Sequence, residues 1–143
     1  MISCTDFIPA YSELFRYLEE NGGKEAVLAY WDDTFGKSKR LRSLVEQHGI
    51  EGCWIYWSHT LNEEAADFTM ELDEEAGEFS IVMHYCPSKG RLLENKHIEP
   101  YHAYCEHCDY YRKSLEPLGY EYNFDMSECD RARCRITVKK KQA

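Results

Sequence analysis

The apolar residues of this chain change their spacing near Phe68, and this change constrains the fold more than any other feature of the sequence. Before it, apolar side chains recur every three or four residues, the spacing of an amphipathic helix. After it, Phe68, Met70 and Leu72 alternate with polar residues, which is typical of a half-buried strand. A second alternating run at residues 79–85 follows an acidic turn at residues 73–77. The two runs therefore predict an antiparallel hairpin.

Residues 1–65 predict three helices. The first ends at Asn21-Gly22-Gly23, because glycine in this place commonly stops a helix. The second has an interruption around Phe35-Gly36 and ends at His48-Gly49. The third begins near Glu51 and is rich in aromatic residues. All three carry an apolar stripe that needs a partner surface.

A second hairpin is predicted at the end of the chain. Residues 120–124 and 134–138 alternate between apolar and polar side chains and are separated by a charged turn. Between the two hairpins, a helix is expected to start near Pro100, which a first helical turn tolerates, and to end before Pro117. Residues 139–143 are expected to form a frayed, charged tail.

These elements predict a single domain of residues 1–143, a common size for one compact unit. It comprises a helical part (1–65), a hairpin-helix-hairpin part (66–138) and the tail (139–143). The expected fold class is α+β, with N-terminal helices packed on a roughly four-stranded antiparallel sheet made of two hairpins separated by a helix.

Charge and composition exclude some functions. The formal net charge is -9, which opposes binding to the phosphates of nucleic acid. No apolar run approaches the roughly 18 residues that a membrane-spanning helix needs, so we expect no membrane partner and a soluble, cytoplasmic protein. Seven cysteines are many for a chain with no predicted export signal. In a reducing compartment such thiols are free, metal-bound or catalytic more often than paired.

The stretch from Tyr101 to Tyr111 concentrates the reactive side chains of the sequence. If it is an α-helix, successive residues turn by about 100°. Cys105, Asp109 and His102 then lie on one flank of an apolar stripe. In the same projection Cys108 falls within the stripe and is expected in the core, whereas His107 points away and is expected at the surface.

The flank of Cys105, His102 and Asp109 fits two kinds of chemistry. As a catalytic cluster, His102 would deprotonate the Cys105 thiol, and Asp109 would orient His102 or activate water. As a metal site, Cys105 and Asp109 would bind zinc together with Cys86 and Cys134. Spacing alone does not choose, because a second Cys-x-x-Cys pair is missing from the sequence.

Four further residues are candidates for contact with a small-molecule substrate. Cys86 precedes Pro87 at the end of the predicted strand, a place where a side chain is often directed into a site. Cys134 shares a strand face with apolar residues. Trp54 and Trp57 lie on the aromatic third helix and are expected either to shape a pocket or to pack in the core.

The chain resembles the L-2-amino-thiazoline-4-carboxylic acid hydrolase-like family. The resemblance rests on short motifs between residues 79 and 136, listed in chain order: Cys86-Pro87, Tyr104-Cys105 with Asp109, Gly119-Tyr120, Asp130 and Cys134. It implies a hydrolase that opens a cyclic, amidine-like C=N bond of a thiazoline ring. Cys108 and Cys129 are not part of the family's pattern. This difference bears on the identity of the substrate more than on the fold.

A second function of a different class remains open from the sequence. The cysteine-rich ending is also similar to small-molecule sensor domains of the 4-vinyl-reductase type, in which cysteines and an acidic residue hold zinc. On that hypothesis the chain is a binding module rather than an enzyme, with zinc on Cys86, Cys105, Asp109 and Cys134. No cofactor is certain from the sequence, and zinc is possible, since Cys105 could also be a metal ligand in the hydrolase.

Overall fold

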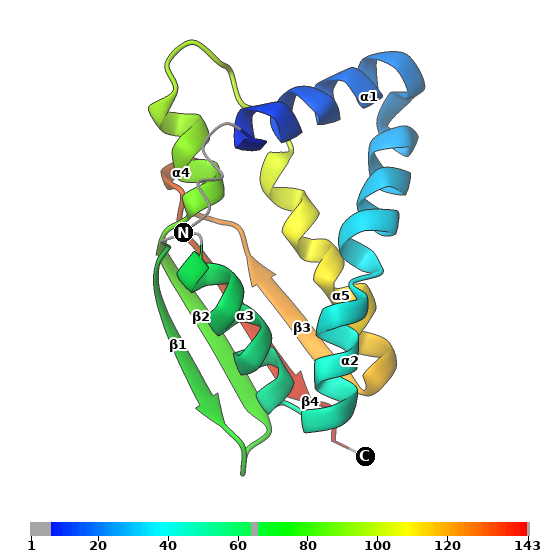
Figure 1. The fold of residues 1–143 in the computed structure, drawn as a ribbon, viewed down its shortest axis with the longest axis vertical. Helices are drawn as coiled ribbons and strands as arrows, with labels where there is room; N and C mark the ends of the chain where they lie inside the picture. Colours follow the sequence, from blue (N-terminus) through cyan, green and yellow to red (C-terminus); the bar gives the residue numbers. More distant parts are fainter. Residues whose placement is uncertain (1–6, 64–65, 143) are drawn as a thin grey trace.

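A computed structural model describes residues 7–63 and 66–142 of the chain (Figure 1). Helices come first, in the order α1 (Phe7–Trp31), η1 (Asp32–Gly36), α2 (Lys39–His48) and α3 (Glu51–Glu63). Then follow β1 (Asp67–Asp73), β2 (Glu78–Tyr85), α4 (Pro87–Glu94), η2 (Tyr104–Tyr111), α5 (Arg112–Leu115), η3 (Glu116–Leu118), β3 (Tyr120–Asp125), η4 (Cys129–Arg131) and β4 (Cys134–Lys140). The predicted α+β fold is confirmed.

The predicted helix stop at Gly23 marks a sharp kink. Gly23 has φ 71° and ψ 179° inside α1, a conformation that glycine adopts without a steric penalty. The two arms of α1 therefore run in different directions (Figure 1). The predicted interruption near Gly36 is a stretch of π-helix, η1, and the predicted stop at Gly49 has φ 62°.

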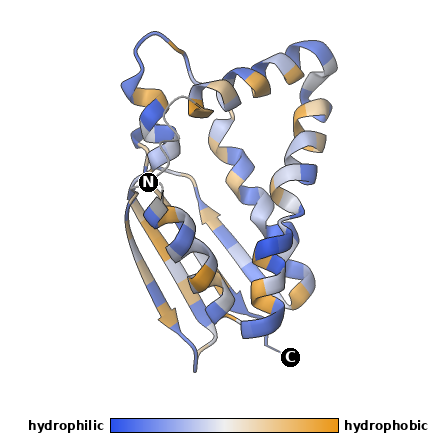
Figure 2. Ribbon diagram, viewed as in Figure 1, coloured by the Kyte–Doolittle hydropathy of each residue, from blue (hydrophilic) through white to orange (hydrophobic). Residues whose placement is uncertain are grey.

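The two predicted hairpins join into one antiparallel sheet with strand order β1-β2-β4-β3. The central pair is β2 and β4, in which Ile81 lies opposite Ile136 and Met83 opposite Cys134. Apolar and polar residues alternate along the strands (Figure 2). The predicted frayed tail begins too early, because Lys139 and Lys140 belong to β4, where Lys139 pairs with Glu78.

The described residues form two apolar cores. The sheet core lies between one face of the sheet and helices α2, α3 and α5, with Leu41, Cys53, Phe79 and Val138 fully buried. The aromatic core lies between α1, α4 and η2, and Phe15 and Trp31 are its largest buried members. In the described part of the chain, no helix combines the length and apolarity needed to cross a membrane.

The segment after Pro100 differs from its prediction. Residues 104–111 form a 3₁₀ helix rather than an α-helix, and only Arg112–Leu115 is α-helical. A 3₁₀ helix has three residues per turn, so side chains three apart lie directly above one another. The side chains of η2 therefore point to other faces of the helix than an α-helical projection predicts.

Candidate functional site

The 3₁₀ geometry of η2 places His107 inside the protein. Its ring is buried against Tyr104, with ring centroids 4.9 Å apart, and against Phe35 at 4.7 Å. Tyr104 and His107 are three residues apart and therefore share a face in a 3₁₀ helix. The prediction that His107 lies at the surface is wrong for this reason.

Hydrogen bonds fix the tautomer of His107. Nδ1 hydrogen-bonds to the carbonyl oxygen of Tyr104, and a carbonyl only accepts, so Nδ1 carries the proton. Burial lowers the pKa of His107 to about 4, and the ring is neutral near pH 7. Nε2 is thus an unprotonated acceptor, and the Sγ of Cys108 lies 3.5 Å from it. A thiol beside such a nitrogen has a base for its proton.

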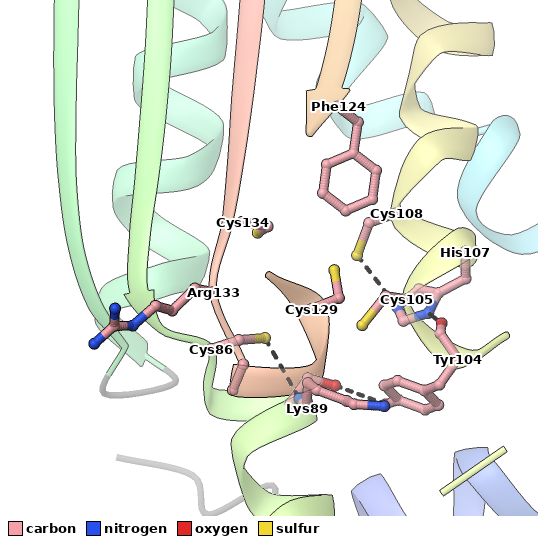
Figure 3. A pocket seen from close by; sticks show the side chains of 12 residues that line it. Cys86, Lys89, Tyr104, Cys105, His107, Cys108, Phe124, Cys129, Arg133 and Cys134 are labelled. Carbon is pink, nitrogen blue, oxygen red and sulfur yellow. Dashed lines mark hydrogen bonds between the residues drawn. The ribbon is translucent and has the colours of Figure 1, made fainter. Parts of the chain in front are cut away.

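Cys108 and Cys105 lie on one face of η2 and line the same cavity, of about 30 Å³. The prediction that Cys108 is separated from Cys105 is therefore wrong, since three residues make a full turn here. Cys86, Cys129 and Cys134 line the cavity as well, so five thiols from four parts of the chain meet there (Figure 3). The structure thus brings together the predicted residues Cys86, Cys105 and Cys134.

The local structure explains how two of these thiols reach the cavity. Cys86 is the N-cap of α4, where its Sγ accepts a hydrogen bond from the backbone N–H of Lys89 at 3.4 Å. The backbone N–H of Cys86 donates to the carbonyl of Ala132 at 2.7 Å, which ties the start of α4 to the connection between β3 and β4. Cys129 belongs to η4 in that connection.

A second, larger cavity of about 440 Å³ adjoins the thiols. Its described lining is largely aromatic and aliphatic and includes no Lys, Arg, Asp or Glu. Trp57 lines this cavity and is buried, with its ring stacked on Phe79. Trp54 is 37% exposed and lines neither cavity. The residues shared by both linings are Cys86, Ser88, Tyr104, His107, Cys108 and Cys134.

The predicted cluster of His102, Cys105 and Asp109 is not assembled. His102 precedes η2, is exposed, and pairs through Nε2 with the carboxylate of Glu19 at 3.0 Å. Both carboxylate oxygens of Asp109 accept hydrogen bonds from Arg112. Because Asp109 is four residues from Cys105, a 3₁₀ helix turns it about a third of a turn away from that thiol.

The predicted zinc set is not supported by the geometry. Within the described ranges, His, Cys, Asp and Glu form no group of three or more arranged to hold a metal ion. Asp109, the predicted oxygen ligand, is engaged by Arg112 instead. Cys86, Cys105 and Cys134 line a common cavity but do not make a metal centre there with Asp109.

His107, Cys108 and Cys129 are the site residues that sequence reasoning missed. A signal for the first two was present, because rings recur at every third position in Tyr101, Tyr104, His107 and Tyr110. A period of three fits a 3₁₀ helix better than an α-helix. Cys129 carried no such signal, since only the folded connection between β3 and β4 brings it to the cavity.

Comparison with protein-family models, with curated proteins and with solved structures finds no match for this chain. The family resemblance therefore remains a prediction from short motifs.

The ion pair between His102 and Glu19 provides a test of the conclusion that His102 lies outside the candidate site. We expect His102→Gln to change the free energy of unfolding by less than about 1 kcal/mol, because exposed ion pairs contribute little, and His102 is 66% exposed. Urea denaturation checks this. A loss well above that range would show that His102 supports the fold in a way that its contacts do not indicate.

Proposed function

We propose that this chain is a small hydrolase that attacks a cyclic C=N group and opens the ring, with Cys108 as nucleophile and His107 as its base. The observation that supports the proposal is the 3.5 Å contact between the Cys108 Sγ and the His107 Nε2, at the junction of the two cavities. The Tyr104 carbonyl orients the imidazole, the part that a carboxylate takes in the Ser-His-Asp triad and an Asn amide in some Cys-His pairs. These roles replace those predicted for Cys105, His102 and Asp109.

The reaction is an addition followed by ring opening. Sγ of Cys108 forms a bond to the ring carbon of the C=N group, and the π electrons move to the ring nitrogen. His107 takes the thiol proton at Nε2 and passes it to that nitrogen. The nitrogen lone pair then re-forms the C=N bond as the bond from the carbon to the ring sulfur breaks, and the departing sulfur takes the proton of that nitrogen by way of His107. Water finally releases the product from Cys108, restores the thiol, and completes the net addition of one water.

The larger cavity indicates the kind of substrate. Its volume, about 440 Å³, lies within the range of about 300–1,000 Å³ typical of small-molecule sites. Trp57, Tyr56 and Phe35 offer flat surfaces for a ring. A carboxylate has no cationic partner in the described lining, and burying an unpaired charge is costly. We therefore expect an uncharged thiazoline or a similar ring in which sulfur is bonded to the C=N carbon, rather than the carboxylate implied by the resemblance.

The test is turnover of a neutral alkyl-substituted thiazoline, followed by NMR of the opened product. We expect Cys108→Ala and His107→Gln each to lower kcat/KM by about 100-fold or more. His102→Gln is the matched control for the histidine and should leave kcat/KM unchanged. Full turnover by Cys108→Ala would overturn the proposal. Loss of turnover in Cys105→Ala but not in Cys108→Ala would restore the role predicted for Cys105.

A further inference from the structure

We propose that Cys129 and Cys105 form a hydroperoxide-reactive thiol pair, in which Cys129 attacks the peroxide and Cys105 closes a disulfide with it. This reactivity goes beyond the proposed hydrolysis and uses neither Cys108 nor His107. The proposal starts from a contact between two elements. Cys105 on η2 and Cys129 on η4 lie close to one another in the thiol cluster (Figure 3), and each shifts the pKa of the other. Both line the smaller cavity (Figure 3).

The surroundings shift the pKa values of the two thiols in opposite directions. The hydrogen bond from Cys105 lowers the pKa of Cys129, and the ammonium group of Lys89 acts in the same direction. Donating that hydrogen bond, together with burial, holds the pKa of Cys105 well above its usual range. Of the two, Cys129 is therefore the thiol that loses its proton more readily. A thiolate is the form of cysteine that attacks peroxides.

The cavity is suited to a small oxidant. A water-sized group needs about 10–15 Å³ of such space, and the cavity offers about 30 Å³, which is room for the two oxygens of hydrogen peroxide. Cys129 is half-buried in a surface connection, so a small molecule can reach it. Two other thiols are less suitable, because burial raises the pKa of Cys53 and of Cys134 to about 12 in each case.

The chemistry requires only the peroxide as oxidant. The Cys129 thiolate attacks one peroxide oxygen, the O–O bond breaks, and hydroxide leaves, so that Cys129 becomes a sulfenic acid. The Cys105 sulfur then attacks the sulfur of that sulfenic acid, and the S–O bond breaks. The Cys105 proton and the hydroxyl group leave as water. Two electrons pass from the thiols to the peroxide, and the product disulfide joins η2 to the connection between β3 and β4.

The test uses the full chain, reduced, freed of reductant and treated with hydrogen peroxide equimolar to the protein. After remaining thiols are blocked, peptide mass spectrometry without reduction should find Cys105 linked to Cys129. In Cys105→Ser, dimedone should trap a sulfenic acid on Cys129. In Cys129→Ser, thiol loss should slow by about tenfold or more. Cys53→Ala is the matched control and should react as the unaltered chain does.

Two further variants separate this proposal from a structural effect and from the hydrolase proposal. Lys89→Met retains the backbone contact to Cys86 and should shift the pH midpoint of Cys129 alkylation upward. Cys108→Ala should still form the Cys105–Cys129 disulfide, whatever its effect on thiazoline turnover. A disulfide that excludes Cys129, or peroxide-dependent thiol loss that is equally fast in Cys129→Ser, would overturn the proposal.

Discussion

Phe15→Ala is expected to lower the free energy of unfolding by about 3–5 kcal/mol, the range for an aromatic side chain removed from a packed core. Phe15 is fully buried. Its ring centroid lies between 5.4 and 6.2 Å from the rings of five neighbours, which are Tyr30, Trp31, Tyr101, Tyr104 and His107. These neighbours belong to α1, to η2 and to the turn before η2. Removing the Phe15 ring therefore leaves a cavity between the elements that hold the candidate site. Urea denaturation near neutral pH measures the loss.

Tyr17 provides the matched control for Phe15. It lies on the same arm of α1 and is 61% exposed, so Tyr17→Ala should change the free energy of unfolding by no more than about 0.5 kcal/mol. Phe15→Leu retains much of the buried volume and should recover most of the loss. Equal costs for Phe15→Ala and Tyr17→Ala would show that the aromatic core does not stabilise this fold.

The role of Phe15 also illustrates how far the sequence predicts the fold. Local patterns identified the helix stops at Gly23 and Gly49 and both hairpins, because each depends on a few neighbouring residues. The order β1-β2-β4-β3 depends on contacts between distant segments. The pairing of Ile81 with Ile136 joins the two hairpins, and no periodicity within either hairpin specifies it.

The structure surrounds the predicted site residue Cys105 with other partners than those predicted. Assigning α-helical geometry to residues 104–111 placed Cys105 beside His102 and Asp109, whereas a 3₁₀ helix places it in line with Cys108. The buried histidine is then His107 rather than His102. Tertiary packing determines this choice, since the rings of Tyr104 and His107 both pack against Phe15.

Acidification is expected to destabilise the protein through His107. Burial lowers the pKa of this residue from 6.5 to about 4 in the folded state. Between these two values the unfolded chain binds a proton on His107 that the folded chain does not, so the free energy of unfolding falls as the pH falls. At 1.36 kcal/mol per pH unit, the contribution lost between pH 6.5 and pH 4 is about 3 kcal/mol. Above pH 6.5 the contribution is fully present, and below pH 4 no more is lost.

His107→Gln separates this contribution from that of the carboxylates. Glutamine does not titrate in this range, so the variant should lose less stability between about pH 7 and about pH 4 than the unaltered chain, by about 3 kcal/mol. The comparison uses the slopes of stability against pH, because the substitution itself lowers stability at every pH. Urea denaturation across this range gives both slopes. Parallel slopes would mean that His107 titrates in the folded chain as it does in the unfolded chain, which would contradict the burial of its imidazole.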